Sequence, residues 1–194
     1  MQIRRRVFLL QSAVWPVLCT RPAQAAEGDD AARLLAEGGA VAAFRHTLAP
    51  GTFDPPGFKI GDCSTQRNLS DEGRAQALQL GAWFKARRLR PAQVRSSPWC
   101  RCVDTANLAF GATTVWPALG SPSERQAAAR SAQQHTLRAA LQLASKRRGT
   151  FEVWVTHMFV INDLAQVALA PGEGLLLRAD RAGAPQVLAR IMVA

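Results

Sequence analysis

Ala40-Val41-Ala42-Ala43-Phe44-Arg45-His46 is the stretch that decides the fold of this 194-residue chain. Five apolar residues follow the pair Gly38-Gly39 and end at two strongly polar side chains. A short apolar run bounded by glycines is typical of a buried strand. The pattern therefore predicts a strand over 40–44 that presents Arg45 and His46 at the edge of a sheet.

Helices and strands alternate on both sides of this stretch. Capping residues and apolar spacing predict helices over 31–37, 71–88, 99–110, 124–146 and 162–169. Further strands are predicted before Ser97, over 151–155, and in a closing pair over 175–178 and 187–193. The alternation predicts an α/β fold, a three-layer αβα sandwich with a mainly parallel central sheet and no second domain.

The first 25 residues have the pattern of an export signal. Arg4-Arg5-Arg6 precedes a mostly apolar run to Leu18, and Ala23-Gln24-Ala25 provides a small-x-small cleavage site. The arginines and the residues after them resemble a twin-arginine signal. The apolar run is too short to span a bilayer. We therefore expect a signal peptide over 1–25, a mature domain over 26–194 in the periplasm or outside the cell, and no stable membrane insertion after cleavage.

The charge of the chain favours anionic ligands. The formal net charge is +10, and the signal carries four arginines and no acid, so its removal would leave +6. A basic surface attracts phosphate esters, lipopolysaccharide and nucleic acid, although a solvated arginine-rich surface has the same composition. No Lys/Arg run with interleaved aromatic residues indicates a nucleic-acid groove.

Three cysteines would remain in the mature chain: Cys63, Cys100 and Cys102. An oxidising compartment makes one disulfide plausible and leaves one thiol free. Cys100 and Cys102 are too close for an easy mutual bridge at a helix start, so we favour Cys63 with Cys100. A zinc site is the alternative, but the cysteine spacing fits none of the usual zinc frameworks.

Three strand ends carry unusual polar residues: Arg45-His46, Ser96-Ser97 with Arg101 just after, and Thr156-His157. In an open α/β sheet, ligands bind outside the carboxyl ends of the strands. A single histidine after a strand is more often a structural loop residue. Three such ends in one chain indicate a shared cleft if the strands are neighbours.

Four sequence blocks resemble the histidine phosphatase superfamily, phosphoglycerate mutase-like branch 1. They are Phe44-Arg45-His46-Thr47, Leu69-Ser70-Asp71-Glu72-Gly73-Arg74-Ala75-Gln76-Ala77, Ser96-Ser97-Pro98-Trp99-Cys100-Arg101-Cys102-Val103-Asp104-Thr105-Ala106, and Val155-Thr156-His157. They occur in the order of that family and span residues 44–157. The resemblance implies a phosphoglycerate mutase-like fold and phosphoryl transfer without a metal or other cofactor. The Ser70 block has a mainly structural interpretation, as a helix start packed closely against the sheet.

The resemblance also implies roles for four residues. His46 would attack phosphorus as a neutral imidazole and form a phosphohistidine that water hydrolyses. Arg45 and Arg101 would bind phosphate oxygens and stabilise charge during transfer. His157 would donate a hydrogen bond to a phosphate oxygen.

The remaining expectations concern the rim of this pocket. Thr47 and Arg67 are expected to contact the substrate. The family generally uses a carboxylic acid to protonate the leaving oxygen, and here Glu124 and Asp54 are rival candidates. Met158 replaces a glycine that often follows the last histidine of the family, so it either tightens the pocket or alters backbone donation to phosphate.

These expectations give a main hypothesis and two alternatives. The main hypothesis is an exported phosphomonoesterase acting on a small phosphorylated substrate, with the loop over 47–67 setting its specificity. A phosphorylated lipopolysaccharide sugar would suit the compartment. The first alternative is a non-catalytic phosphate or phospho-sugar binding protein on the same fold. The second is a phosphohistidine-protein phosphatase, which export argues against.

Overall fold

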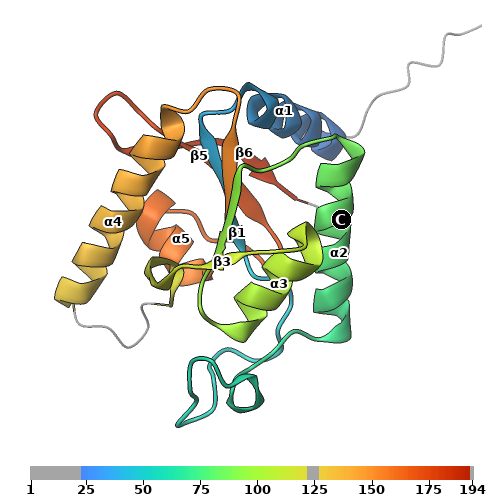
Figure 1. Cartoon of the computed structure of the whole chain (residues 1–194), viewed down its shortest axis with the longest axis vertical. Helices are drawn as coiled ribbons and strands as arrows, with labels where there is room; N and C mark the ends of the chain where they lie inside the picture. Colours follow the sequence, from blue (N-terminus) through green and yellow to red (C-terminus); the bar gives the residue numbers. More distant parts are fainter. Residues whose placement is uncertain (1–22, 122–126, 193–194) are drawn as a thin grey trace, which may run out of the picture.

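A computed structural model describes residues 23–121 and 127–192 of the chain, which form a sheet flanked by helices (Figure 1). The helices are α1 (Ala23–Glu37), η1 (Cys63–Thr65), α2 (Asp71–Ala86), α3 (Cys100–Phe110), η2 (Pro117–Leu119), α4 (Ala127–Ser145) and α5 (Met158–Ala165). The strands are β1 (Ala40–Arg45), β2 (Gln93–Ser96), β3 (Thr114–Val115), β4 (Phe151–Thr156), β5 (Gly174–Ala179) and β6 (Pro185–Ile191).

The sheet is mixed but mostly parallel. Its strand order is β3-β2-β4-β1-β5-β6, and the first four of these strands are parallel to one another. β5 runs antiparallel to β1, and β6 pairs antiparallel with β5. The expected α/β class is therefore confirmed, and so is the closing antiparallel pair at the end of the chain.

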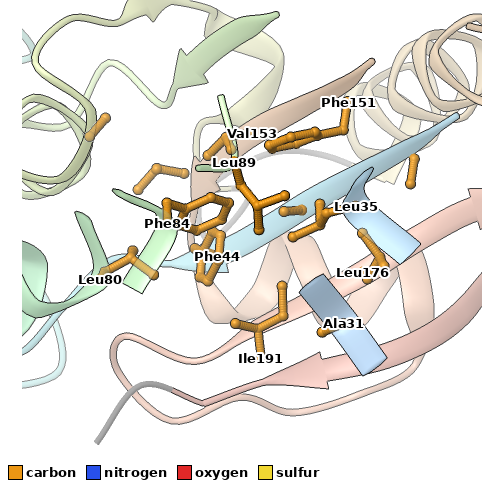
Figure 2. Packing of buried hydrophobic residues seen from close by; sticks show 14 of the residues in the cluster. Ala31, Leu35, Phe44, Leu80, Phe84, Leu89, Phe151, Val153, Leu176 and Ile191 are labelled. Carbon is orange, nitrogen blue, oxygen red and sulfur yellow. The ribbon is translucent and has the colours of Figure 1, made fainter. Parts of the chain in front are cut away.

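Side chains of β1 alternate between two separate cores, because successive residues of a strand point to opposite faces of the sheet. Phe44 packs with Leu35 of α1 and Phe84 of α2 in one core (Figure 2). Val41 packs in the other core with residues of α4 and α5. In Figure 1, α4 and α5 lie on one side of the sheet and α1 and α2 on the other. The three-layer αβα arrangement is thus confirmed.

The start of α2 is packed tightly against the chain that leaves β1. Ser70 caps the helix, and its Oγ accepts a hydrogen bond from the Gly73 amide at 3.1 Å. A Cβ on Gly73 would lie 2.0 Å from the carbonyl oxygen of Leu48, so this position excludes a side chain. This close contact agrees with the structural interpretation of the Ser70 block and fixes the segment that directly follows His46.

Three elements differ from the sequence expectations. α1 begins at Ala23 rather than at residue 31, and β3 is a two-residue strand that the sequence pattern did not indicate. α5 begins at Met158 rather than at residue 162. The run Met158–Ile161 is apolar and β-branched enough to suggest an extended strand, but burial of Val160, Ile161 and Leu164 stabilises a helix.

Residues 47–68, which we call the pocket loop, connect β1 to α2 and lie beyond the end of the sheet (Figure 1). The loop contains a single described turn of 3₁₀ helix, Cys63–Thr65. Within the described part of the chain, no helix combines the length and apolar character needed to cross a membrane. The residues of the expected signal lie mainly outside the described ranges.

Candidate active site

The three polar strand ends lie at one edge of the sheet. β1 and β4 are neighbouring parallel strands with Arg45 opposite Thr156, and β2 pairs with β4 with Ser96 opposite Val155. The residues that follow these strands, His46, Ser97 and His157, therefore emerge together. This convergence depends on β4 lying between β1 and β2, which the sequence could not establish.

His46 is held as a neutral imidazole with one nitrogen available. The residue is 3% exposed, and its Nδ1 lies 2.8 Å from the carbonyl oxygen of Thr47. A carbonyl oxygen can only accept, so Nδ1 carries the proton and Nε2 keeps its lone pair. Burial, together with Arg101 and Arg45, lowers the pKa of His46 to about 3 despite that hydrogen bond. This histidine is a ready nucleophile at neutral pH.

Thr47 orients His46 and lies outside the pocket lining. Its amide donates to Thr105 Oγ1 at 3.2 Å, and the two hydroxyls lie 3.0 Å apart. Thr105 in turn donates to the carbonyl oxygen of Arg101 at 2.7 Å. The amide and the hydroxyl of Thr47 are therefore both used in tying the segment after β1 to Thr105 of α3, and contact of Thr47 with substrate stays a prediction.

Three arginines surround the nucleophile. Arg45 Nη1 donates to the carbonyl oxygen of Leu169 at 2.8 Å, and Arg67 Nη1 donates to Gly51 at 2.8 Å and also to Ala49. Burial and the charge of Arg101 lower the pKa of the other two guanidiniums. The Nε atoms of all three arginines are buried without a hydrogen-bond partner. Unpaired buried donors are costly. All three arginines also line the pocket, where a guanidinium can bind an anion.

Asp54 pairs with Arg101 inside the pocket. Their side chains are 7% and 5% exposed, and Arg101 Nη1 lies 2.8 and 3.1 Å from the two carboxylate oxygens. The carboxylate also accepts from the Arg67 amide at 2.9 Å and from Trp99 Nε1 at 3.0 Å. Burial opposes ionisation of Asp54, but the bonds from Arg67 and Arg101 outweigh it, and its pKa lies below the usual value.

This arrangement disfavours Asp54 as a proton donor, a role that stays a prediction from the sequence. A general acid needs a pKa near the working pH, whereas Asp54 is held as the carboxylate. Its contacts make it a positioning residue for Arg101 instead. The rival candidate, Glu124, lies outside the described residues.

His157 is the N-cap residue of α5 and lies beside His46 in the site. Its ring centroid lies 5.5 Å from that of His46, and its Nε2 lies 2.7 Å from Ser97 Oγ. Ser97 Oγ also accepts from the Trp99 amide at 3.3 Å, which leaves its proton free to be donated to Nε2. In that arrangement, His157 Nδ1 carries a proton. Burial and Arg101 place the pKa of His157 well below its usual value, so the ring is neutral.

A disulfide ties the pocket loop to the first turn of α3. It joins Cys63 to Cys100, which confirms the pairing favoured from the sequence. The Cys100 amide also donates to Gln66 Oε1 of the loop at 3.0 Å. Cys102 is a buried free thiol 3.6 Å from His157 Nε2, and burial raises the pKa of this thiol to about 12. Cys102 is therefore unreactive at neutral pH.

The pocket combines these residues with apolar side chains that, apart from Met158, sequence reasoning had not assigned to it. Phe53 and Phe58 come from the pocket loop, Trp99 from the start of α3, and Met158 and Phe159 from α5. Met158 Sδ lies 3.8 Å from Arg45 Nη1, so the side chain that replaces glycine covers this arginine. Within residues 23–121 and 127–192, no cluster of His, Cys, Asp and Glu could hold a metal ion.

Comparison with known families supports the sequence resemblance. A family model described as histidine phosphatase superfamily (branch 1) matches residues 62–120. The matched segment contains the Ser70 block and the Ser96-Ser97 block with Arg101, while His46 and His157 lie outside it. No curated protein matches the sequence significantly.

Solved structures share the fold at low sequence identity. The protein histidine phosphatase SixA, complexed with tungstate, is 14% identical at a TM-score of 0.56, with 78% of this chain and 96% of that chain covered. A mutant phosphoserine phosphatase from Entamoeba histolytica in complex with phosphoserine is 13% identical at 0.57, with 78% and 95% covered. Phosphoglycerate mutase from Thermus thermophilus is 20% identical at 0.54, with 80% and 99% covered. The family-model match and the phosphoglycerate mutase-like fold together confirm the resemblance of this chain to branch 1 of the histidine phosphatase superfamily.

Proposed function

We propose that this protein is an exported phosphatase that hydrolyses a small phosphate monoester through a phosphohistidine on His46. The observation that carries the proposal is the state of His46, a neutral imidazole with Nε2 free, beside three arginines whose buried Nε atoms have no partner. The phosphoserine bound to the structurally similar phosphatase from Entamoeba histolytica is consistent with this substrate class.

In the first step, Nε2 of His46 attacks phosphorus as the bond from phosphorus to the ester oxygen breaks. The alcohol leaves with a proton, and the phosphoryl group stays on His46. Water then attacks phosphorus, inorganic phosphate leaves, and Nε2 recovers its lone pair. The hydrogen bond from Nδ1 to the Thr47 carbonyl stabilises the positive charge that develops on the ring during attack.

The charge of the pocket matches a phosphate monoester. Arg45, Arg67 and Arg101 supply three positive charges, and Asp54 removes one of them. The remaining charge of two complements a dianion. Guanidiniums also bind phosphate oxygens bidentately, and fixed donors aimed at the transferring group stabilise its charge in the transition state.

Glu124 is the proton donor that we propose for the leaving oxygen, since Asp54 is held as a carboxylate. Glu124→Gln should slow the hydrolysis of alkyl phosphates much more than that of p-nitrophenyl phosphate, whose leaving group needs little protonation. An equal effect on both substrates would remove Glu124 from this role.

Export is proposed from residues 1–25, and the disulfide between Cys63 and Cys100 supports it, because such bonds persist in oxidising compartments. Fractionation of cells and mass analysis of the mature protein should locate it outside the cytoplasm and without the signal. Replacing Arg5 and Arg6, the two arginines directly before Val7-Phe8-Leu9, by lysine should block export. A protein that keeps residues 1–25 in the cytoplasm would instead favour a phosphohistidine-protein phosphatase.

The catalytic proposal is tested with the mature protein and p-nitrophenyl phosphate. His46→Ala should abolish hydrolysis, and the wild type should form an acid-labile phosphohistidine when mixed with ³²P-labelled substrate. His135→Ala, on the exposed face of α4, is a matched control that should leave both results unchanged. Full activity of His46→Ala would exclude the mechanism.

A non-catalytic phosphate-binding protein is the second candidate, and the state of Asp54 favours it. That buried carboxylate is occupied by Arg101, so the described part of the pocket offers no carboxylic acid for proton transfer. This candidate requires phosphate binding by calorimetry without turnover and without a labelled histidine.

A further inference from the structure

The lining of the pocket has two kinds of residue, which we call its charged floor and its apolar mouth. The floor carries the arginines and His46, where the phosphate of an ester would lie. The residues that share an apolar face at the mouth are Phe53, Phe58, Trp99, Met158 and Phe159. We expect the organic group of an ester bound at the arginines to contact these side chains, because they line the same cavity.

Phe53 and Phe159 are unusually exposed for large apolar side chains. Phe53 is 72% exposed and Phe159 is 40% exposed. Among the described residues they are the two aromatic members of the set of exposed large hydrophobic side chains, and both line this one pocket. Exposed aromatic groups beside a cavity are a feature of ligand sites, because a bound apolar group removes them from water.

The rings behind them are held in place. Trp99 Nε1 donates to Asp54 at 3.0 Å, so the polar edge of the indole is already occupied. Phe58 packs on Trp99 with ring centroids 6.0 Å apart. Because Trp99 and Phe58 are held before binding, these two rings lose little conformational entropy when a flat group enters.

Few polar groups at the mouth could recognise a sugar. Apart from the charged and histidine residues of the floor, the described residues that line the pocket offer the side-chain hydroxyls of Thr52 and Ser121. Sites that select a sugar need a hydrogen-bond partner for most of its hydroxyls. An apolar wall would instead leave those hydroxyls buried without partners.

We propose that the substrate is a phosphate ester of an aromatic alcohol, whose ring lies between Phe53 of the pocket loop and Phe159 of α5. This inference rests on the proposed function, since it places the phosphate of the ester at the arginines beside His46. It replaces the phospho-sugar that the compartment had suggested with an aryl or arylalkyl ester.

The test uses phenylphosphonate and methylphosphonate, whose carbon–phosphorus bonds are not hydrolysed. Their binding to the mature protein is measured by calorimetry at a pH where both are dianions. The aromatic compound should bind about tenfold more tightly, the gain expected from partial burial of one ring. Phe53→Ala and Phe159→Ala should each reduce this preference severalfold and leave methylphosphonate binding unchanged.

Two further variants complete the experiment. Ile60→Ala is the matched control, because Ile60 is an exposed large apolar residue of the same loop and is not part of the pocket lining. It should keep the full preference, and Phe53→Trp should keep it as well. Equal binding of the two phosphonates to the wild type would overturn the inference, and so would a preference that survives both alanine variants.

The result of this binding experiment can be distinguished from the result of the phosphatase assay that tests the proposed function. A preference for phenylphosphonate in a protein without phosphatase activity would uphold the aromatic subsite and reject the catalytic proposal. Phosphatase activity in a protein that binds both phosphonates equally would uphold the catalytic proposal and reject the aromatic subsite. Failure of both phosphonates to bind would reject the subsite together with the anion site beneath it.

Discussion

The two parts of the pocket are held together by different forces. His46 and His157 directly follow β1 and β4, which are buried except at Arg45 and whose backbones pair along their whole length. The pocket loop is largely exposed and is held by the Cys63–Cys100 disulfide, the ion pair of Asp54 with Arg101, and bonds from Arg67 to loop carbonyls. Sheet packing therefore fixes the nucleophile, and a few individual bonds fix the loop.

This difference suits the two regions to two roles: the sheet edge to catalysis and the pocket loop to substrate selection. Residues on a rigid sheet edge keep the geometry that phosphoryl transfer requires. A loop with few buried apolar contacts opens more easily, and its sequence can change without loss of the core. We therefore expect changes at the sheet edge to reduce turnover and changes in the loop to alter stability and substrate preference.

The largest effect is expected from Arg101→Ala, which removes a donor from the phosphate at the boundary of the two regions. The value of kcat/KM should fall by about 10²- to 10³-fold, as for other donors to transition-state charge. Arg101→Lys should restore part of the loss, because it keeps the charge without the fork of donors. Steady-state kinetics with p-nitrophenyl phosphate measures both.

Arg130→Ala is the control for that experiment. Arg130 forms an exposed ion pair with Asp163 at 2.7 Å, away from the pocket, and such pairs contribute less than about 1 kcal/mol. Similar kinetic losses in Arg101→Ala and Arg130→Ala would contradict the role of Arg101.

Removing the disulfide tests how the loop is held. The Cys63→Ser/Cys100→Ser double variant should lose roughly 3–4 kcal/mol in the free energy of unfolding, because the bridge closes a long segment of chain. The two cysteines are separated by 37 positions in the sequence. Urea unfolding of the variant and of the oxidised wild type measures the loss, and equal midpoints and slopes would show that the loop is held without the bridge.

The pH dependence of stability tests the sheet edge. Burial and the nearby arginines hold the pKa of His46 at about 3, whereas in the unfolded chain it returns to about 6.5. Between these values the unfolded state binds a proton that the folded state does not, so stability falls as the pH falls. From pH 7 to pH 5, His46 should account for a loss of about 2 kcal/mol.

The measurement is urea unfolding of the wild type and His46→Gln at both pH values. The variant lacks the titrating ring, so its loss of stability on acidification should be smaller. His157 acts in the same direction, because its pKa is also lowered, and it should account for part of the remaining slope. Identical slopes in the two proteins would contradict a buried neutral His46.

The smallest effect is expected from Asp54→Asn. Asparagine has nearly the same size and its one oxygen can still accept the bond from the Arg67 amide, although its amide nitrogen cannot accept from Trp99, so the pocket should keep most of its shape. The value of kcat/KM should change by less than about tenfold, well below the effect of losing a general acid. A loss comparable to that of Arg101→Ala would restore Asp54 as the proton donor.

The sequence predicted much of the fold because local signals agreed. The glycine pair before Ala40, the cap at Ser70 and the apolar run at Phe151 each marked the start of an element that the structure contains. The start of α5 was predicted wrongly, because Met158–Ile161 has the composition of a strand and its helical form depends on burial against the second core. β3 has two residues, too few to carry a periodic signal.

For the site, the sequence by itself determined the residue types and the strand ends that carry them. Arg45-His46, Arg101 and His157 follow from motifs, and the pairing of Cys63 with Cys100 follows from spacing and compartment. Those inferences need no more than the order of residues along the chain, because each motif lies within a few positions of an element end.

Only the tertiary structure decided which of these residues contact one another. Strand order brings His46 beside His157, and the pocket loop folds back so that Asp54 pairs with Arg101. Thr47 turns toward Thr105, and Phe53 and Phe159, separated by more than half of the chain, line one mouth. Such contacts arise from packing between distant segments, and local sequence carries no record of which segments will meet.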